Sequence, residues 1–315
     1  MAGDGHQVAA KSGHRRRKSR VAEYVEYVLA RIGIVLIGAL PPRLSCRLAR
    51  TLGSLAFLIL RKRRAIAVRN ILAAGVADTP ASAKRIAKES FQSFALTVAE
   101  SFLFHRVGED LECEIDPEAE KAMRETNCGF ICSSGHLGNW EVGAQFLTRY
   151  RPITGIARRM GNARIQRLMD SRGMRKDFET IDKHSGRPMD IVRALKRNRG
   201  LAILSDQHAS VDGAVVIDFF GRKAATYSTP VVIQRLTGAP IVFAYAIRTG
   251  FMRFRVHIEG PIFYDIPKDA KDEAVANATQ DLASRLEAAI RKYPGQYLWA
   301  HRRWKYAERR QGGNA

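Results

Sequence analysis

Cysteine is scarce in this sequence of 315 residues. The cysteines are Cys46, Cys113, Cys128 and Cys132, and only the last two lie close together. No second close pair and no histidine at the spacing of a zinc ligand accompanies them, so a disulfide framework, a metal site and a redox centre are unfavoured. We expect four reduced thiols, in the core or at the surface, in a reducing compartment.

Long apolar runs are also missing. The segment Ile32 to Pro42 is uncharged but covers only eleven residues, whereas a membrane-spanning helix needs roughly 20. Extended back to Tyr24, the segment fits a helix that lies in or on one leaflet, with Tyr24 and Tyr27 among the headgroups. A buried core helix is the alternative. The first twenty residues are polar and basic without an apolar segment, so we expect a disordered basic arm and no secretory signal.

Acidic residues are few relative to basic ones. The chain has 52 Lys and Arg against 31 Asp and Glu, a net charge of +21, which indicates an anionic partner. Nucleic acid, anionic lipid and an acidic carrier protein all fit this charge. No helix-turn-helix, zinc or ribonucleoprotein signature is present, and the basic clusters are scattered among apolar helices. Nucleic-acid binding is therefore the weaker interpretation.

The first hundred residues carry helical patterns. From Leu44 to Leu60, apolar residues recur at helical spacing, and a basic cluster from Arg61 to Arg64 follows, which suits a leaflet with anionic headgroups. A second helical pattern runs from Pro80 to Phe104. We expect a helical, membrane-associated region over residues 21–106.

The pattern changes after this region. Short β-branched runs alternate with amphipathic stretches, which is typical of an α/β fold whose mostly parallel central sheet has helices on both faces. No internal repeat is visible. We expect this domain over residues 107–305, with a closing helix from Lys271 to Lys292 and a flexible tail over 306–315. The predicted strands are Phe130–Cys132, Ile153–Ile156, Leu201–Leu204, Val215–Phe219, Ile241–Tyr245 and Phe254–Ile258.

A histidine follows the first of these strands, in a glycine-flanked turn. The spacing of His136 and Glu141 means little by itself, because His105 and Asp110 share it. His136 differs because a buried strand precedes it, and because Asn139 can cap a helix whose first turns include Glu141. It therefore lies off the carboxyl end of a strand, where open α/β sheets bind ligands.

The turn can bring His136 and Glu141 together. In a continuous helix, residues five apart are separated by about 140°. Gly135 and Gly138 let the backbone fold back, so that Glu141 accepts a proton from one ring nitrogen and leaves the other as a base. No serine or cysteine nucleophile accompanies the pair, which indicates acyl transfer to a substrate hydroxyl. A histidine that faces the core is the alternative.

Four stretches of the sequence resemble a known family. The stretch Gly135-His-Leu-Gly-Asn-Trp-Glu141 resembles the His-four-residues-acid motif of the lysophospholipid and lipid A acyltransferase superfamily, in particular the late, or secondary, lipid A acyltransferases. The similarity runs in order from about Ile32 to Lys305. The further matching stretches are Ser205-Asp206-Gln207, Phe219-Phe220-Gly221 followed by Ala224-Ala225-Thr226, and Tyr297-Leu-Trp-Ala-His-Arg-Arg-Trp-Lys305.

This resemblance implies an enzyme at the cytoplasmic face of a bacterial inner membrane. It implies transfer of a fatty acyl chain from the thioester of acyl carrier protein to a hydroxyl of a lipid A precursor, without a metal or cofactor. His136 would be the general base and Glu141 would orient it. Acyl carrier protein is acidic and lipid A carries phosphates, so both fit the basic charge. We expect a monomer.

The resemblance also implies binding residues. Basic side chains are candidates for the acceptor, the developing oxyanion or the carrier protein, and a polar pair would shape the pocket. His301, in contrast, is expected to be structural. The expected binding residues are Arg158, Arg159, Arg172, Asp206, Gln207, Arg302 and Arg303.

Two other acceptors stay open. Glycerol-phosphate and lysophosphatidate acyltransferases carry a Glu-Gly-Thr-Arg-like second motif, but Glu259-Gly260 leads here into Pro261. That departure places the phospholipid branch second. Mannoside acyltransferases of the same superfamily share the Gly-Asn-Trp-acid turn and use acyl-coenzyme A, and the sequence does not decide between the two donors.

Overall fold

The computed structural model describes residues 19–107, 111–157, 159–170, 177–182, 188–209, 214–267 and 272–305. Most of the expected basic arm and all of the expected tail lie outside these residues. Within them, helices come first and an α/β arrangement follows.

Four helices make up the N-terminal part of the fold: α1 (Arg20–Ala39), α2 (Pro42–Ile59), α3 (Arg61–Ala73) and α4 (Pro80–Val107). The hydroxyl of Ser19 caps α1 by accepting the N–H of Ala22, and proline at the start of α2 costs no helical hydrogen bond. Buried Phe57, Ile71 and Ile86 pack α2, α3 and α4 together. The predicted helical character of this region is confirmed.

Helix α1 carries its apolar side chains on the outside. None of its residues is buried, although it contacts α2, α4 and α7 (Ala163–Asp170). Over the ranges that the structure describes, every helix is too short or too polar to cross a membrane. The large apolar side chains exposed on α1 are Val21, Tyr24, Val25, Leu29, Ile32, Val35 and Leu36.

A mostly parallel sheet of seven strands forms the centre of the described part of the chain. Strand β2 lies in the middle, and its almost complete burial explains its continuous apolar run. Every neighbouring pair is parallel except β8 with β9. The spatial order is β1 (Leu111–Ile115), β9 (Arg253–Ile262), β8 (Ile241–Gly250), β2 (Phe130–Ser134), β5 (Gly200–Leu204), β3 (Ile153–Ala157) and β4 (Phe178–Asp182).

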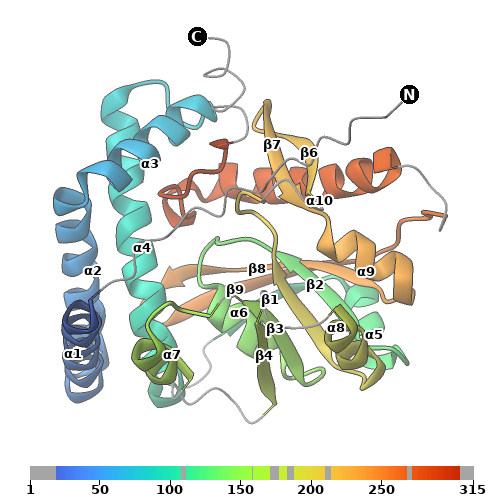
Figure 1. Cartoon of the computed structure of the whole chain (residues 1–315), viewed down its shortest axis with the longest axis horizontal. Helices are drawn as coiled ribbons and strands as arrows, with labels where there is room; N and C mark the ends of the chain where they lie inside the picture. Colours follow the sequence, from blue (N-terminus) through green and yellow to red (C-terminus); the bar gives the residue numbers. More distant parts are fainter. Residues whose placement is uncertain are drawn as a thin grey trace, which may run out of the picture.

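Helices cover both faces of this sheet, as predicted. Phe130 and Cys132 of β2 pack with α5 (Pro117–Glu125) and α6 (Trp140–Leu147). Ile131, which points the other way, packs with α8 (Pro188–Lys196), α9 (Thr229–Thr237) and α10 (Asp272–Lys292). Figure 1 shows α1 to α4 along one side of the sheet and α10 lying above it.

The sheet differs from the prediction at three strands. The run from Val215 lies in β6 (Ala214–Phe219), which pairs antiparallel with β7 (Arg222–Tyr227) outside the main sheet. Strands β1 and β4 were not predicted. Both lie at the edges of the sheet, none of their side chains is buried, and neither has the continuous apolar run of a central strand. The four cysteines are free thiols, as expected.

Candidate active site

The register of two central strands brings two remote segments together. Strands β2 and β5 are parallel, and Ser134 is aligned with Leu204. If the same register continues for two more residues, His136 lies beside Asp206. The N–H of Ser205 donates to the carbonyl of Ser134 at 3.2 Å, which keeps the two chains adjacent just past the strands. The site therefore lies at the carboxyl edge of the sheet, as predicted for His136.

Asp206 holds His136 at two points. Its Oδ2 accepts the backbone N–H of His136 at 3.0 Å, and its Oδ1 lies 2.8 Å from the ring Nδ1. Because an ionised carboxylate only accepts hydrogen bonds, Nδ1 carries the proton and Nε2 of the neutral ring is an acceptor. The side-chain amide of Gln207 lies 3.3 Å from Nε2. The ring is thus set as a base with its lone pair directed toward Gln207.

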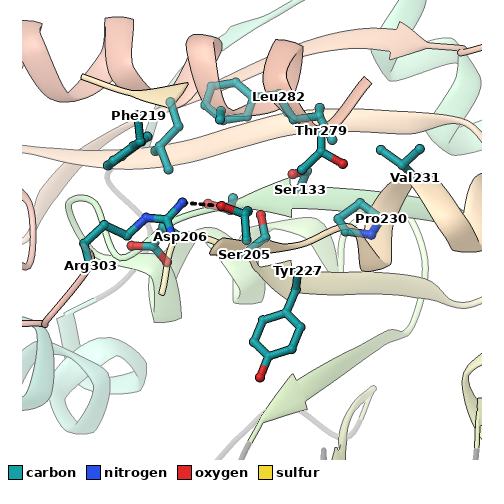
Figure 2. A pocket seen from close by; sticks show the side chains of 15 residues that line it. Ser133, Ser205, Asp206, Phe219, Tyr227, Pro230, Val231, Thr279, Leu282 and Arg303 are labelled. Carbon is teal, nitrogen blue, oxygen red and sulfur yellow. Dashed lines mark hydrogen bonds between the residues drawn. The ribbon is translucent and has the colours of Figure 1, made fainter. Parts of the chain in front are cut away.

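The environment of Asp206 keeps it ionised. Burial raises the pKa of this carboxyl, but the charge of the protonated form of His136, two hydrogen bonds from His136 and the charge of Arg303 outweigh burial and lower the pKa to about 2. Asp206 and Arg303 line one small pocket between the sheet and α10 (Figure 2). The cavity measures about 10 Å³, room for roughly one water molecule and not for an acyl chain. Asp206 itself is only 4% exposed.

The turn after His136 depends on close backbone contacts. Gly138 has a φ of 63° and lies so near the carbonyl of Ala246 that a Cβ would come within 1.9 Å of that oxygen. Asn139 caps α6, since its Oδ1 accepts the N–H of Val142 at 3.1 Å. The predicted cap is confirmed. From the C-terminal segment, Leu298 donates its N–H to the carbonyl of His136 at 3.0 Å.

The predicted pairing of His136 with Glu141 is not confirmed. Glu141 is half-buried in the first turn of α6, but the ring nitrogens of His136 face Asp206 and Gln207. Asp206 takes the place expected for Glu141 because the helix begins at Trp140, whose ring lies 5.0 Å from the imidazole. The sequence placed Asp206 and Gln207 at the same sheet edge, but only as residues that shape the pocket.

The predicted basic residues have different surroundings. Arg159 and Arg302 are exposed. Arg303 is only 3% exposed, and its guanidinium donates to the carbonyl of Ala225 and the hydroxyl of Thr226. This burial does not fit the predicted contact of Arg303 with phosphate or carrier protein: the segment around Trp304 folds inward, and the charge of Arg303 acts on Asp206. Arg158, Arg172 and Asp110 lie outside the described residues, and so does the side chain of His105.

Further polar residues surround the turn, and some of them were not expected. The ring Nε2 of His301 accepts the N–H of His208 at 3.1 Å, and burial lowers the pKa of His301 to about 4. This neutral histidine fits the structural role predicted for it. Glu100 of α4 and Arg248 of β8 form an ion pair under the turn. Because these two residues are 148 positions apart in the sequence, no local pattern predicted their pairing.

These observations define a class of enzyme. Within the described residues, His136 has a buried carboxylate on one ring nitrogen and neither a serine hydroxyl nor a thiol on the other. This arrangement is compatible with a base that acts on a substrate group. The chain belongs to the bacterial lipid A biosynthesis acyltransferase family, whose sequence model matches residues 13–306. It is therefore an acyltransferase.

Curated relatives agree with this family. The chain is 24% identical over 273 residues to the lipid A biosynthesis palmitoleoyltransferase of Escherichia coli (strain K12), covering 84% of this chain and 86% of that protein. It is 23% identical over 284 residues to the lipid A biosynthesis lauroyltransferase of the same organism, covering 87% and 90%.

A solved structure of the 1-acyl-sn-glycerophosphate acyltransferase PlsC from Thermotoga maritima aligns with a TM-score of 0.35 and 14% identity. The alignment covers 78% of this chain and 96% of that one. The family assignment rests on the sequence matches alone.

Proposed function

We propose that this enzyme transfers a fatty acyl chain from acyl carrier protein to a hydroxyl of a lipid A precursor, with His136 as the general base. The observation that carries the proposal is the buried Asp206 carboxylate on Nδ1, 2.8 Å away, which leaves Nε2 free of a proton. The family and the two relatives support lipid A as the acceptor.

The reaction needs no nucleophile from the protein. The acceptor hydroxyl oxygen attacks the thioester carbonyl carbon while Nε2 of His136 takes the hydroxyl proton. Asp206 stabilises the imidazolium that forms, and its charge is retained throughout. The tetrahedral intermediate then expels the thiolate, which receives the proton from Nε2. The products are an ester and a free thiol. Glu141 remains an alternative candidate for the residue that orients His136, but only because it lies five positions after His136 in the sequence.

The surface of the N-terminal helices supports a position on an anionic leaflet. Exposed apolar side chains on α1, among them Leu29 and Ile32, offer an area that inserts between lipids. Next to α2, helix α3 begins with Arg61-Lys62-Arg63-Arg64 and has no acidic residue in its first turn. We propose that these helices hold the enzyme at the cytoplasmic face of the inner membrane, with the cations at the headgroups.

A groove beside α3 is further support for the proposal of an anionic partner. It measures about 690 Å³ and combines an apolar floor with three cationic side chains. An acidic carrier protein and a lipid phosphate both complement such a surface. The lining residues are Arg64, Ala65, Val68, Arg69, Leu72, Ala73 and Lys84.

The function is tested in cells and in solution. Deletion of the gene should remove one acyl chain from lipid A, measured by mass spectrometry, and the intact gene should restore it. His136→Ala should not restore it, whereas His257→Ala, a matched change at a histidine of β9, should. An unchanged lipid A profile after deletion refutes the acceptor, and full rescue by His136→Ala refutes the mechanism.

The donor and the alternative acceptors are separated with purified enzyme. Acyl carrier protein and coenzyme A thioesters are each offered with a lipid A precursor, a lysophospholipid or a mannoside glycolipid. We expect ester formation above background with the carrier thioester and the lipid A precursor. Fractionation in high salt should leave the enzyme with membranes, whereas a nucleic-acid-binding protein would be released.

A further inference from the structure

A buried ion pair lies directly beneath the catalytic turn. The Nε and Nη2 atoms of Arg248 each lie 2.6 Å from one carboxylate oxygen of Glu100. The side chains are 13% and 1% exposed. Arg248 also donates to the hydroxyl of Ser93 at 3.1 Å. The pair therefore joins α4 to β8 with little access to water.

This pair is connected to the turn through Asn139. The Nδ2 of Asn139 donates to Oε2 of Glu100 at 2.8 Å, and the amide is completely buried. The backbone N–H of Asn139 donates to the carbonyl of Ala246, two residues before Arg248 on β8. From α4, the hydroxyl of Thr97 donates to the carbonyl of Gly138 at 3.1 Å. Glu100 thus contacts the segment that follows His136 directly, and Arg248 is linked to it through Glu100 and through the hydroxyl of Thr97, which accepts a hydrogen bond from Nη2 of Arg248 at 3.4 Å.

The fold alone does not account for a charged pair at this place. Two apolar side chains of similar volume generally stabilise a core as well as a buried ion pair does, because burial of the charges costs their hydration. Unlike an apolar contact, an ion pair also forms hydrogen bonds of defined direction. Each oxygen of Glu100 has a fixed donor, and one of these donors is Asn139. Displacement of a catalytic group by 1 Å can cost roughly 100-fold in rate.

We propose that Glu100 and Arg248 are positioning residues for the acyl transfer: through Asn139 they fix the turn that carries His136. The inference rests on the proposed role of His136 as the base. Neither residue is required to touch the substrate. Their effect should appear in kcat, because a displaced base affects the transition state more than the binding of either substrate.

The test exchanges two polar groups. Asn139→Asp keeps the oxygen that caps α6 but turns a second carboxylate toward Glu100, so kcat should fall at least roughly tenfold. Glu100→Gln leaves Arg248 without its ionic partner and should also lower kcat. The double variant Asn139→Asp with Glu100→Gln retains one carboxylate, one amide and Arg248, with places exchanged. It should recover kcat to within about threefold of the wild type.

A control variant separates positioning from loss of an ion pair in general. Arg199 lies 3.1 Å from Glu179 near the amino edge of the sheet, opposite to His136. Glu179→Gln should leave kcat unchanged. Each variant is measured for kcat, for KM of both substrates, and for its thermal unfolding midpoint. We expect KM to change less than about threefold in the exchange variants.

The outcomes are distinct. Single exchange variants that fold and keep the wild-type kcat overturn the inference, and so does a double variant no more active than the weaker single variant. If Asn139→Asp does not fold, Arg248→Lys is measured in its place, because lysine keeps the positive charge but loses the two-point contact with Glu100. An unchanged kcat of Arg248→Lys then overturns the inference. If His136→Ala keeps its activity in the same assay, the proposed function itself fails.

Discussion

The replacement Asp206→Asn removes the base without removing the histidine. Oδ2 of Asp206 accepts the backbone N–H of His136, and Oδ1 accepts Nδ1–H. An asparagine has only one acceptor oxygen, and the backbone N–H cannot change its role. The amide oxygen will therefore face the backbone, and the NH₂ group will face Nδ1. Nδ1 must then be unprotonated, so the proton moves to Nε2 and the base is lost.

The expected loss of activity is large. In enzymes with a histidine base, loss of the orienting carboxylate lowers kcat by roughly 10⁴-fold, and we expect a loss of about 10³- to 10⁴-fold here. Transfer of a labelled acyl chain to the acceptor at saturating substrates measures kcat, and the ¹⁵N shifts of the His136 ring report which nitrogen carries the proton. Glu141→Gln should cost far less. If instead Glu141→Gln abolishes activity and Asp206→Asn retains kcat within about threefold, the assignment of Asp206 is wrong.

The same variant changes how stability depends on pH. The pKa of Asp206 is lowered from its ordinary 3.8 to about 2 in the folded chain. This corresponds to about 2 kcal/mol of stability at neutral pH. A carboxyl whose folded pKa is depressed contributes fully above its unfolded pKa and loses the contribution as the pH falls toward the folded pKa. Urea unfolding should show the difference between wild type and Asp206→Asn fall to roughly half as the pH is lowered from 5 to 3. A pH-independent difference would contradict this.

Three further predictions test the surroundings of the site. Gly138→Ala should cost more than about 2 kcal/mol in urea unfolding, because of its positive φ and the close carbonyl of Ala246; a loss below about 0.5 kcal/mol would refute the turn geometry. Folded His301 stays neutral because its pKa is about 4, while the unfolded chain gains a proton below about 6.5. Stability should therefore fall as the pH drops from 6.5 to 4, and His301→Gln should flatten that slope; an equal slope argues against the buried neutral ring. Leu29→Glu on the exposed face of α1 should weaken sedimentation with anionic vesicles without lowering the thermal midpoint, and unchanged binding would remove α1 from the membrane contact.

Local patterns in the sequence were sufficient to predict one half of the site. His136 follows a buried apolar strand and precedes an Asn cap, and both signals lie within ten residues. The carboxylate partner lies 70 residues away, so spacing favoured the nearby Glu141. The strand before Asp206 was predicted, and it placed Asp206 at the correct edge of the sheet. Only the register of β2 against β5 shows that the two side chains meet.

Edge strands and a buried charged residue limited the prediction of the rest of the fold and of the candidate site. Strands β1 and β4 have no buried side chain, so they lack the apolar run that marked the central strands. The run at Val215 has the same pattern whether it joins the sheet or a separate hairpin. The resemblance to the family predicted Arg303 as a binding residue for an external partner, which requires an exposed guanidinium. Its burial depends on Ala225 and Thr226, which are almost 80 residues distant.

The dependence on register explains why the site requires a rigid sheet. A shift of one residue between β2 and β5 would align His136 with Ser205 or Gln207 and would turn Asp206 toward the opposite face. The apolar side chains of both strands resist that shift, since Ile131 and Leu201 would move from one covered face to the other. The burial that stabilises the centre of the sheet therefore also sets the distance between the base and its carboxylate. On the far side of the turn, Asn139 and Gly138 are fixed to α4 and β8. His136 is thus held from both directions, with Nδ1 on Asp206 and Nε2 beside the amide of Gln207.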